Sequence, residues 1–222
     1  MNCTPLNSLI VAGLCLWAAV VVAEDAEPDW DALEAGFSTS QVNEGELEFL
    51  TTRPAGRILK TTNTLTILPA SLQDGWVRLA QCQSSLDPVD SITVQYRYTG
   101  MRDLKVISAS NMDSAWVEGS TVQLRGVRQG GEVCIEAAVQ VLKDDGAGGF
   151  SLRSGPFHRR FLDGYYPVEL VYRITWPPEQ LALREARPAA VPGLAVQSGP
   201  GELAIDALFE GKLVVELSFG RL

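Results

Sequence analysis

The sequence predicts an all-β protein, an antiparallel β-sandwich of about 11 to 13 short strands, preceded by a short acidic segment. Apolar and polar residues alternate with a period of two through most of the chain after residue 47. Clusters of Gly, Asp and Pro separate these runs at short intervals. The hydrophobic fraction of 46% is sufficient for one sizeable core, and no internal repeat suggests a propeller or solenoid.

Residues 1–23 have the features of a secretion signal. Residues 9–23 form an unbroken apolar run, shorter than the roughly 20 residues that cross a bilayer as a helix. The run ends in small residues directly before Glu24, as a cleavage site does. Residues 1–8 carry no Lys or Arg, which is atypical, so an uncleaved anchor and a wrongly assigned start remain alternatives. We expect a mature chain without a transmembrane segment, located in the periplasm or outside the cell.

Residues 24–46 form an acidic segment that carries most of the charge surplus. Nine of the 27 acids lie between residues 24 and 52, where there is no Lys or Arg. The other eighteen acids equal the 18 basic residues, so the net charge of -9 comes from this end. A solvated tail is the simplest interpretation, and a cationic partner or weak calcium binding is the alternative. Trp30, Leu33 and Phe37 have helical spacing, and such a short helix needs a surface to dock on.

The strand predictions follow from the alternation after residue 47. Val133, Ile135 and Val139 alternate with Glu132 and Glu136, so one face of that strand is expected in the core and the other in water. The longest alternating runs are 92–98, 133–141, 168–176 and 213–219. Shorter candidate strands are 47–51, 63–68, 75–82, 103–108, 113–118, 121–127, 149–153, 180–185 and 202–209.

The cysteines predict one disulfide. Cys3 and Cys15 leave with the signal, so Cys82 and Cys134 remain and are expected to pair in an oxidising compartment. The bridge closes a loop of about 50 residues, worth roughly 4 kcal/mol in the chain-entropy description, and two free thiols are the alternative. Both cysteines are in phase with polar neighbours, which predicts a bridge near the surface, unlike the buried bridge of immunoglobulin domains.

The C-terminal part is predicted to complete one domain spanning residues 47–222. Five prolines interrupt residues 177–201, which we interpret as a connector. Residues 202–219 are predicted to be a hairpin that turns at Glu210 and Gly211. Because a lone hairpin is unstable in water, it must pack on the main sheets.

Several catalytic schemes are disfavoured. His158 is the only histidine, which excludes multi-histidine metal sites, and no nucleophile elbow accompanies it. The adjacent arginines also disfavour a protonated imidazole. No phosphate-binding loop, dinucleotide fingerprint, CxxC or EF-hand loop occurs. We therefore expect no catalytic residues, no metal and no cofactor, and the acidic balance argues against nucleic acid as a partner.

The most distinctive stretch is 155–167, which combines two arginines, the histidine and four aromatic residues between Gly and Pro breaks. Aromatic loops with adjacent arginines bind sugars, carboxylates or anionic lipids. The candidate ligand-binding residues are Arg159, Arg160, His158, Tyr165 and Tyr166.

A structural role for the same stretch is the alternative. Phe157, Phe161 and Tyr165 would then anchor a long crossover, while Arg159 or Arg160 pairs with Asp163.

Together these features favour an exported binding or assembly module of the bacterial cell envelope over an enzyme. An envelope protein or a glycan is the expected partner. The alternatives are a glycan-directed hydrolase that uses a carboxylate pair, and a structural subunit of an envelope complex.

Overall fold

The computed structural model describes residues 43–161 and 163–222. The predicted signal and almost all of the acidic segment, including its helix, lie outside the described residues. The described part confirms the all-β prediction: it contains seventeen strands and one helix of four residues, α2 (Ser71–Asp74). No helix in this part is long and apolar enough to cross a membrane.

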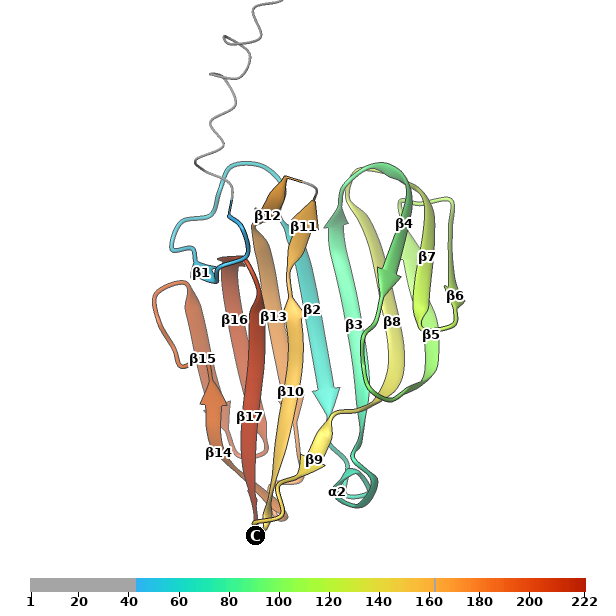
Figure 1. The fold of residues 1–222 in the computed structure, drawn as a ribbon. Helices are drawn as coiled ribbons and strands as arrows, with labels where there is room; N and C mark the ends of the chain where they lie inside the picture. Colours follow the sequence, from blue (N-terminus) through green and yellow to red (C-terminus); the bar gives the residue numbers. More distant parts are fainter. Residues whose placement is uncertain (1–42, 162) are drawn as a thin grey trace, which may run out of the picture. The chain divides into compact units, whose positions relative to one another are not determined.

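The strands form one large sheet, two smaller sheets and a short two-stranded ribbon (Figure 1). The large sheet contains β1 (Glu48–Phe49), β16 (Glu202–Glu210), β13 (Val168–Thr175), β2 (Leu59–Thr66), β3 (Trp76–Leu86), β8 (Gly131–Gln140) and β5 (Met101–Ser110) in this order, and β15 (Leu194–Gly199) also pairs with β16. The four-stranded sheet contains β14 (Leu181–Arg187), β17 (Leu213–Arg221), β10 (Gly149–Phe157) and β9 (Leu142–Asp144). The three-stranded sheet contains β4 (Val89–Gln95), β7 (Thr121–Val127) and β6 (Ser114–Glu118), and the ribbon contains β11 (Arg159–Phe161) and β12 (Gly164–Tyr166). Every pairing is antiparallel except that of β13 with β2.

The sheets pack against one shared hydrophobic core and so form the layers of a sandwich. Between the large and the four-stranded sheet, Phe157 of β10 meets Tyr172 of β13 edge to face, with ring centroids 6.2 Å apart. Trp176 and Phe219 make a similar contact at 5.2 Å. In Figure 1 the four-stranded sheet lies against one part of the large sheet, and β4, β7 and β6 lie beside β8 and β5.

The alternation in the sequence predicted the faces of the strands correctly. In β8, Val133, Ile135 and Val139 are buried, whereas Glu132 and Glu136 are exposed. This is the pattern of a strand with one face in the core and the other in water.

The disulfide confirms the predicted pairing and its position. Cys82 of β3 and Cys134 of β8 stand directly opposite each other, with Cα atoms 4.1 Å apart. Both residues are half-buried on the outer face of the large sheet. The bridge therefore joins two neighbouring strands of one sheet and lies near the surface.

Residues 202–219 are not a hairpin, which corrects the prediction. β16 pairs with β13, β15 and β1 in the large sheet, whereas β17 pairs with β10 and β14 in the other layer. The connection is an arch between layers. Local sequence does not distinguish the two, because each strand alternates in the same way and the turn at Gly211 suits both.

The predicted connector 177–201 contains two strands: β14, which confirms the candidate strand 180–185, and β15, which was not expected. β15 and other short strands raise the count above the expected number. All five of its prolines lie outside the strands: two precede β14, two separate it from β15 and one follows β15. Both are edge strands, where neighbouring prolines are tolerated.

Candidate binding groove on the four-stranded sheet

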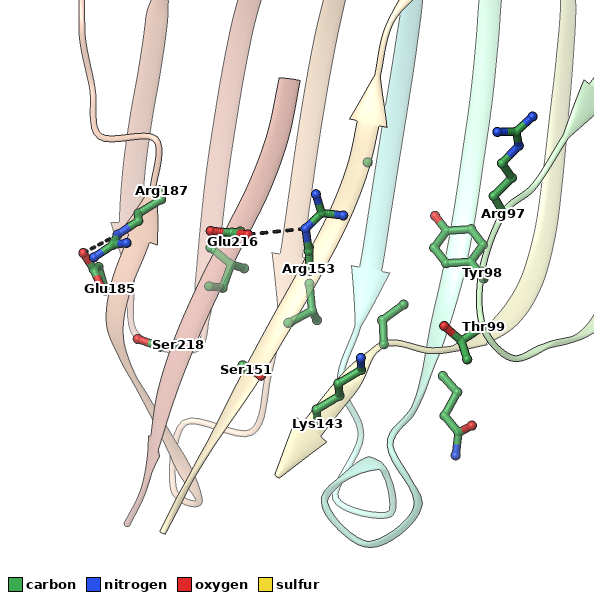
Figure 2. A pocket seen from close by; sticks show the side chains of 15 residues that line it. Arg97, Tyr98, Thr99, Lys143, Ser151, Arg153, Glu185, Arg187, Glu216 and Ser218 are labelled. Atoms are coloured by element: carbon green, nitrogen blue, oxygen red, sulfur yellow. Dashed lines mark hydrogen bonds and ion pairs between the residues drawn. The ribbon is translucent and has the colours of Figure 1, made fainter. Parts of the chain in front are cut away.

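A groove of about 480 Å³ lies on the outer face of the four-stranded sheet. Its floor comes from β9, β10, β17 and β14, and residues 97–99, between β4 and β5, form a wall. Figure 2 shows Arg97, Tyr98 and Thr99 on one side of the groove and Glu185 and Arg187 on the other.

Strand alternation places the polar residues on the groove floor. In β10, Leu152 and Ser154 are buried toward the core, so Ser151 and Arg153 point outward. In β17, Leu217 is buried, and its neighbours Glu216 and Ser218 face the groove.

The strand register arranges these side chains in two rows across the sheet. The first row joins Ser151 to Ser218, with Lys143 on one side and Glu185 on the other. Its centre offers two hydroxyl groups, which both donate and accept hydrogen bonds.

The second row alternates in charge. Arg153, Glu216 and Arg187 lie on adjacent strands in register. Arg153 Nε lies 3.3 Å from Glu216 Oε1, and Arg187 Nε lies 2.7 Å from Glu185 Oε1. The hydrogen bond that Arg187 donates to Glu185 raises the pKa of Arg187, and the negative charges of Glu185 and Glu216 add to this rise.

Positive charge exceeds negative charge in the groove. It contains four cations, Arg97, Lys143, Arg153 and Arg187, but only two acids, Glu185 and Glu216. Both acids are ion-paired to arginines. Within the described residues Arg97 and Lys143 have no acidic partner, and Arg97 makes only a long hydrogen bond to Gln95. The groove is therefore suited to attract an anion.

Tyr98 separates the groove from the interior. Figure 2 shows its ring between the wall segment and β10. Burial raises the pKa of Tyr98, and the nearby Ser154 hydroxyl offsets part of this rise. The phenol therefore stays neutral and offers an apolar face to the groove.

The structure divides the five ligand-binding residues predicted from the sequence. Arg159 is largely buried and ion-paired to Asp87, in the turn between β3 and β4, rather than to Asp163. Asp163 instead accepts a hydrogen bond from the Tyr166 hydroxyl. Tyr165 is buried, so Arg159, Tyr165 and Tyr166 have structural contacts of their own.

Phe157 is buried as the structural alternative expected, whereas Phe161 is 46% exposed and packs against Tyr166. The hairpin is thus anchored by Phe157 and Tyr165, and by the ion pair of Arg159, but not by Phe161.

His158 and Arg160 remain at the surface and gather with Lys212 around Tyr165. The Tyr165 ring centroid lies 5.8 Å from that of His158, 5.6 Å from the Arg160 guanidinium and 5.2 Å from Lys212 Nζ. Partial burial and then the charges of Lys212, Arg160 and Arg97 lower the pKa of His158. We call His158, Arg160 and Lys212 the Tyr165 cluster.

The sequence did not identify the groove. Residues 149–153 and 213–219 were expected as strands, but the sequence contained no sign that β10, β17 and β14 are neighbours. Arg97 and Lys143 come from other segments and carry no motif. Outward-facing basic residues near serines are common, so this pattern would not have identified Arg97 and Lys143 as parts of a site.

No protein-family model matches the chain, and no curated protein matches it in sequence. Among solved structures, similar chains include a mutant of an M1 zinc metallopeptidase from Deinococcus radiodurans, with a TM-score of 0.41 and 15% identity, covering 81% of this chain and 43% of that chain. A putative nutrient binding protein from Legionella pneumophila has a TM-score of 0.36 and 8% identity, covering 80% of this chain and 70% of that chain. The chain thus spans less than half the length of the peptidase.

Proposed function

We propose that this protein is an exported binding module of the bacterial cell envelope, and that the groove binds an acidic saccharide. The observation that carries the proposal is the groove's excess of cations, with Arg97 and Lys143 free of acidic partners among the described residues. A carboxylate held by such cations forms charge-assisted hydrogen bonds, which are stronger than neutral ones.

The uncharged lining supports a saccharide as the bearer of that charge. Ser151, Ser218, Thr99 and Gln140 supply hydroxyl and amide groups that match sugar hydroxyls. Tyr98 adds an aromatic surface for the apolar face of a ring. A small set of polar groups around an aromatic contact is the usual composition of a specific small-ligand site.

Two features support export. The N-terminal run has the features of a secretion signal. The Cys82–Cys134 bridge suits an oxidising compartment such as the periplasm.

Calorimetric titration with trigalacturonate tests the proposal. We expect binding by the wild-type protein, and a loss of about tenfold in affinity, which is about 1.4 kcal/mol, in the double variant Arg97→Gln with Lys143→Gln. The control variant, Arg57→Gln with Lys105→Gln, removes two charges outside the groove and should bind like the wild type. Equal losses in both variants would contradict a site in the groove, and equal affinity for neutral trigalactose would contradict an acidic ligand.

A glycan hydrolase is less well supported. The two acids of the groove are both ion-paired, Glu185 with Arg187 and Glu216 with Arg153. A glycosidase needs one carboxyl group that holds a proton for the leaving group.

A structural subunit that extends its sheet is also less well supported. β5 is a ten-residue edge strand with Ile107 exposed. An edge strand presents backbone groups to which another chain can pair. Its pairing to β8 is irregular at two places, and Arg102, Asp103 and Lys105 are charged and exposed. Bulges and charges of this kind protect edge strands from pairing.

A further inference from the structure

The Tyr165 cluster lies at one end of the strands that form the groove floor. β10 continues from Ser151 and Arg153 to its end at Phe157, directly before His158. β17 runs antiparallel beside it and begins directly after Lys212, with Phe157 opposite Leu213. His158 and Lys212 are therefore brought to the same end of this strand pair.

Arg97 connects the groove to the cluster. It lines the groove wall and is close enough to His158 for its charge to affect the imidazole. From Ser151 to His158 the chain advances roughly 20 Å, at about 3.3 Å per strand residue. Cations thus recur along this distance, from Lys143 through Arg97 to the cluster.

In the described part of the chain, no acid forms an ion pair with Arg160 or Lys212. Asp87 pairs with Arg159, and Asp163 accepts from Tyr166. Glu44 and Glu46 flank Gly45, which adjoins Lys212, but neither forms an ion pair with Lys212.

We propose that the site extends from the groove along β10 and β17 to the Tyr165 cluster, and that its ligand is a linear acidic polysaccharide lying along these strands. This inference rests on the proposed function and specifies its ligand: a chain with repeated carboxylates rather than a single acidic sugar. Such a chain places successive anions over cations that are spaced along the strands.

A length series of oligogalacturonates tests the inference by calorimetric titration. The octamer should bind the wild-type protein at least tenfold more tightly than the trimer, because only the octamer reaches the cluster. In the variant Arg160→Gln with Lys212→Gln this gain should be lost while trimer affinity stays unchanged. The charge-conserving variant Arg160→Lys with Lys212→Arg should keep the gain, which separates charge from packing on Tyr165.

His158 provides a second readout, because it is the only histidine and gives one set of imidazole signals in NMR spectra of the untagged protein. A carboxylate held nearby favours the imidazolium form. The octamer should therefore raise the pKa of His158, and the trimer should leave it unchanged.

The outcomes separate the two proposals. One outcome is that the trimer binds through Arg97 and Lys143 while the octamer binds no tighter and leaves the pKa of His158 unchanged. That result would contradict the extended site but would support binding in the groove. If neither oligomer binds the wild-type protein, both proposals fall. If linear polyphosphate of equal charge binds more tightly than the octamer, the polysaccharide assignment is overturned.

Discussion

Among the residues that the structure describes, three buried side chains each have a polar atom without a hydrogen-bond partner: Asn63 Nδ2, Ser154 Oγ and Tyr172 Oη. Asn63 and Tyr172 are neighbours in register on β2 and β13, and Ser154 comes from β10 in the facing layer. Gln81 donates to Asn63 Oδ1, so only one end of that amide is paired. Burial raises the pKa of Tyr172, which keeps its hydroxyl protonated. An unpaired buried polar group costs about 1–3 kcal/mol.

We predict that Tyr172→Phe stabilises the protein. The substitution removes a buried hydroxyl that lies near the Ser154 hydroxyl but makes no hydrogen bond of good geometry with it. The free energy of unfolding should therefore rise by about 1 kcal/mol. Chemical denaturation of the two proteins measures the difference.

The matched control for that substitution is Tyr166→Phe, which removes a hydroxyl that donates to Asp163 and should bring no gain. A loss of stability in Tyr172→Phe would mean that its hydroxyl is paired in solution, contrary to the structure.

Residue-level features were predicted well where one strand decides them. The alternation assigned Val133, Ile135 and Val139 to the core, and the phase of Cys82 and Cys134 placed the bridge near the surface. Both depend only on the period of two along a strand.

At the scale of elements, the connection between β16 and β17 links the two layers. Gly211 has a positive φ of 84°, and a Cβ atom there would lie 1.9 Å from the backbone oxygen of Glu46. Both the left-handed conformation and the close approach require glycine at this position.

We predict that Gly211→Ala costs about 3 kcal/mol or more, because the arch must shift or the segment at Glu46 must leave its place. Gly146→Ala is the matched control: its φ is 70° but no atom lies within 4 Å of the added Cβ, so only the backbone strain of about 1 kcal/mol applies. Thermal unfolding of the two variants measures the difference. Equal losses would show that the Glu46 contact does not constrain the arch.

Elements that depend on distant pairing could not be predicted. The arch was expected as a hairpin because Glu210 and Gly211 suit either connection. The groove needs β10 to pair with β17, and its ion pair joins Arg153 to Glu216, 63 residues apart in sequence. Nothing local in either strand specifies that partner.

At the scale of the whole described part, one hydrophobic core joins the sheets. The sequence showed that charges balance after residue 52, but it could not show their distribution in space. The fold gathers Arg97 and Lys143 beside β10 and β17 and leaves them without acids, in the part of the chain that the structure describes. The proposed function rests on this arrangement.

Amide hydrogen exchange with and without saturating octagalacturonate measures that arrangement most directly. If the ligand binds in the groove, β10, β17 and residues 97–99 should gain protection from exchange. β2 and β3 should gain none, because they belong to the large sheet, in the other layer of the sandwich. Unchanged exchange in β10 and β17, or protection concentrated in β2 and β3, would contradict it.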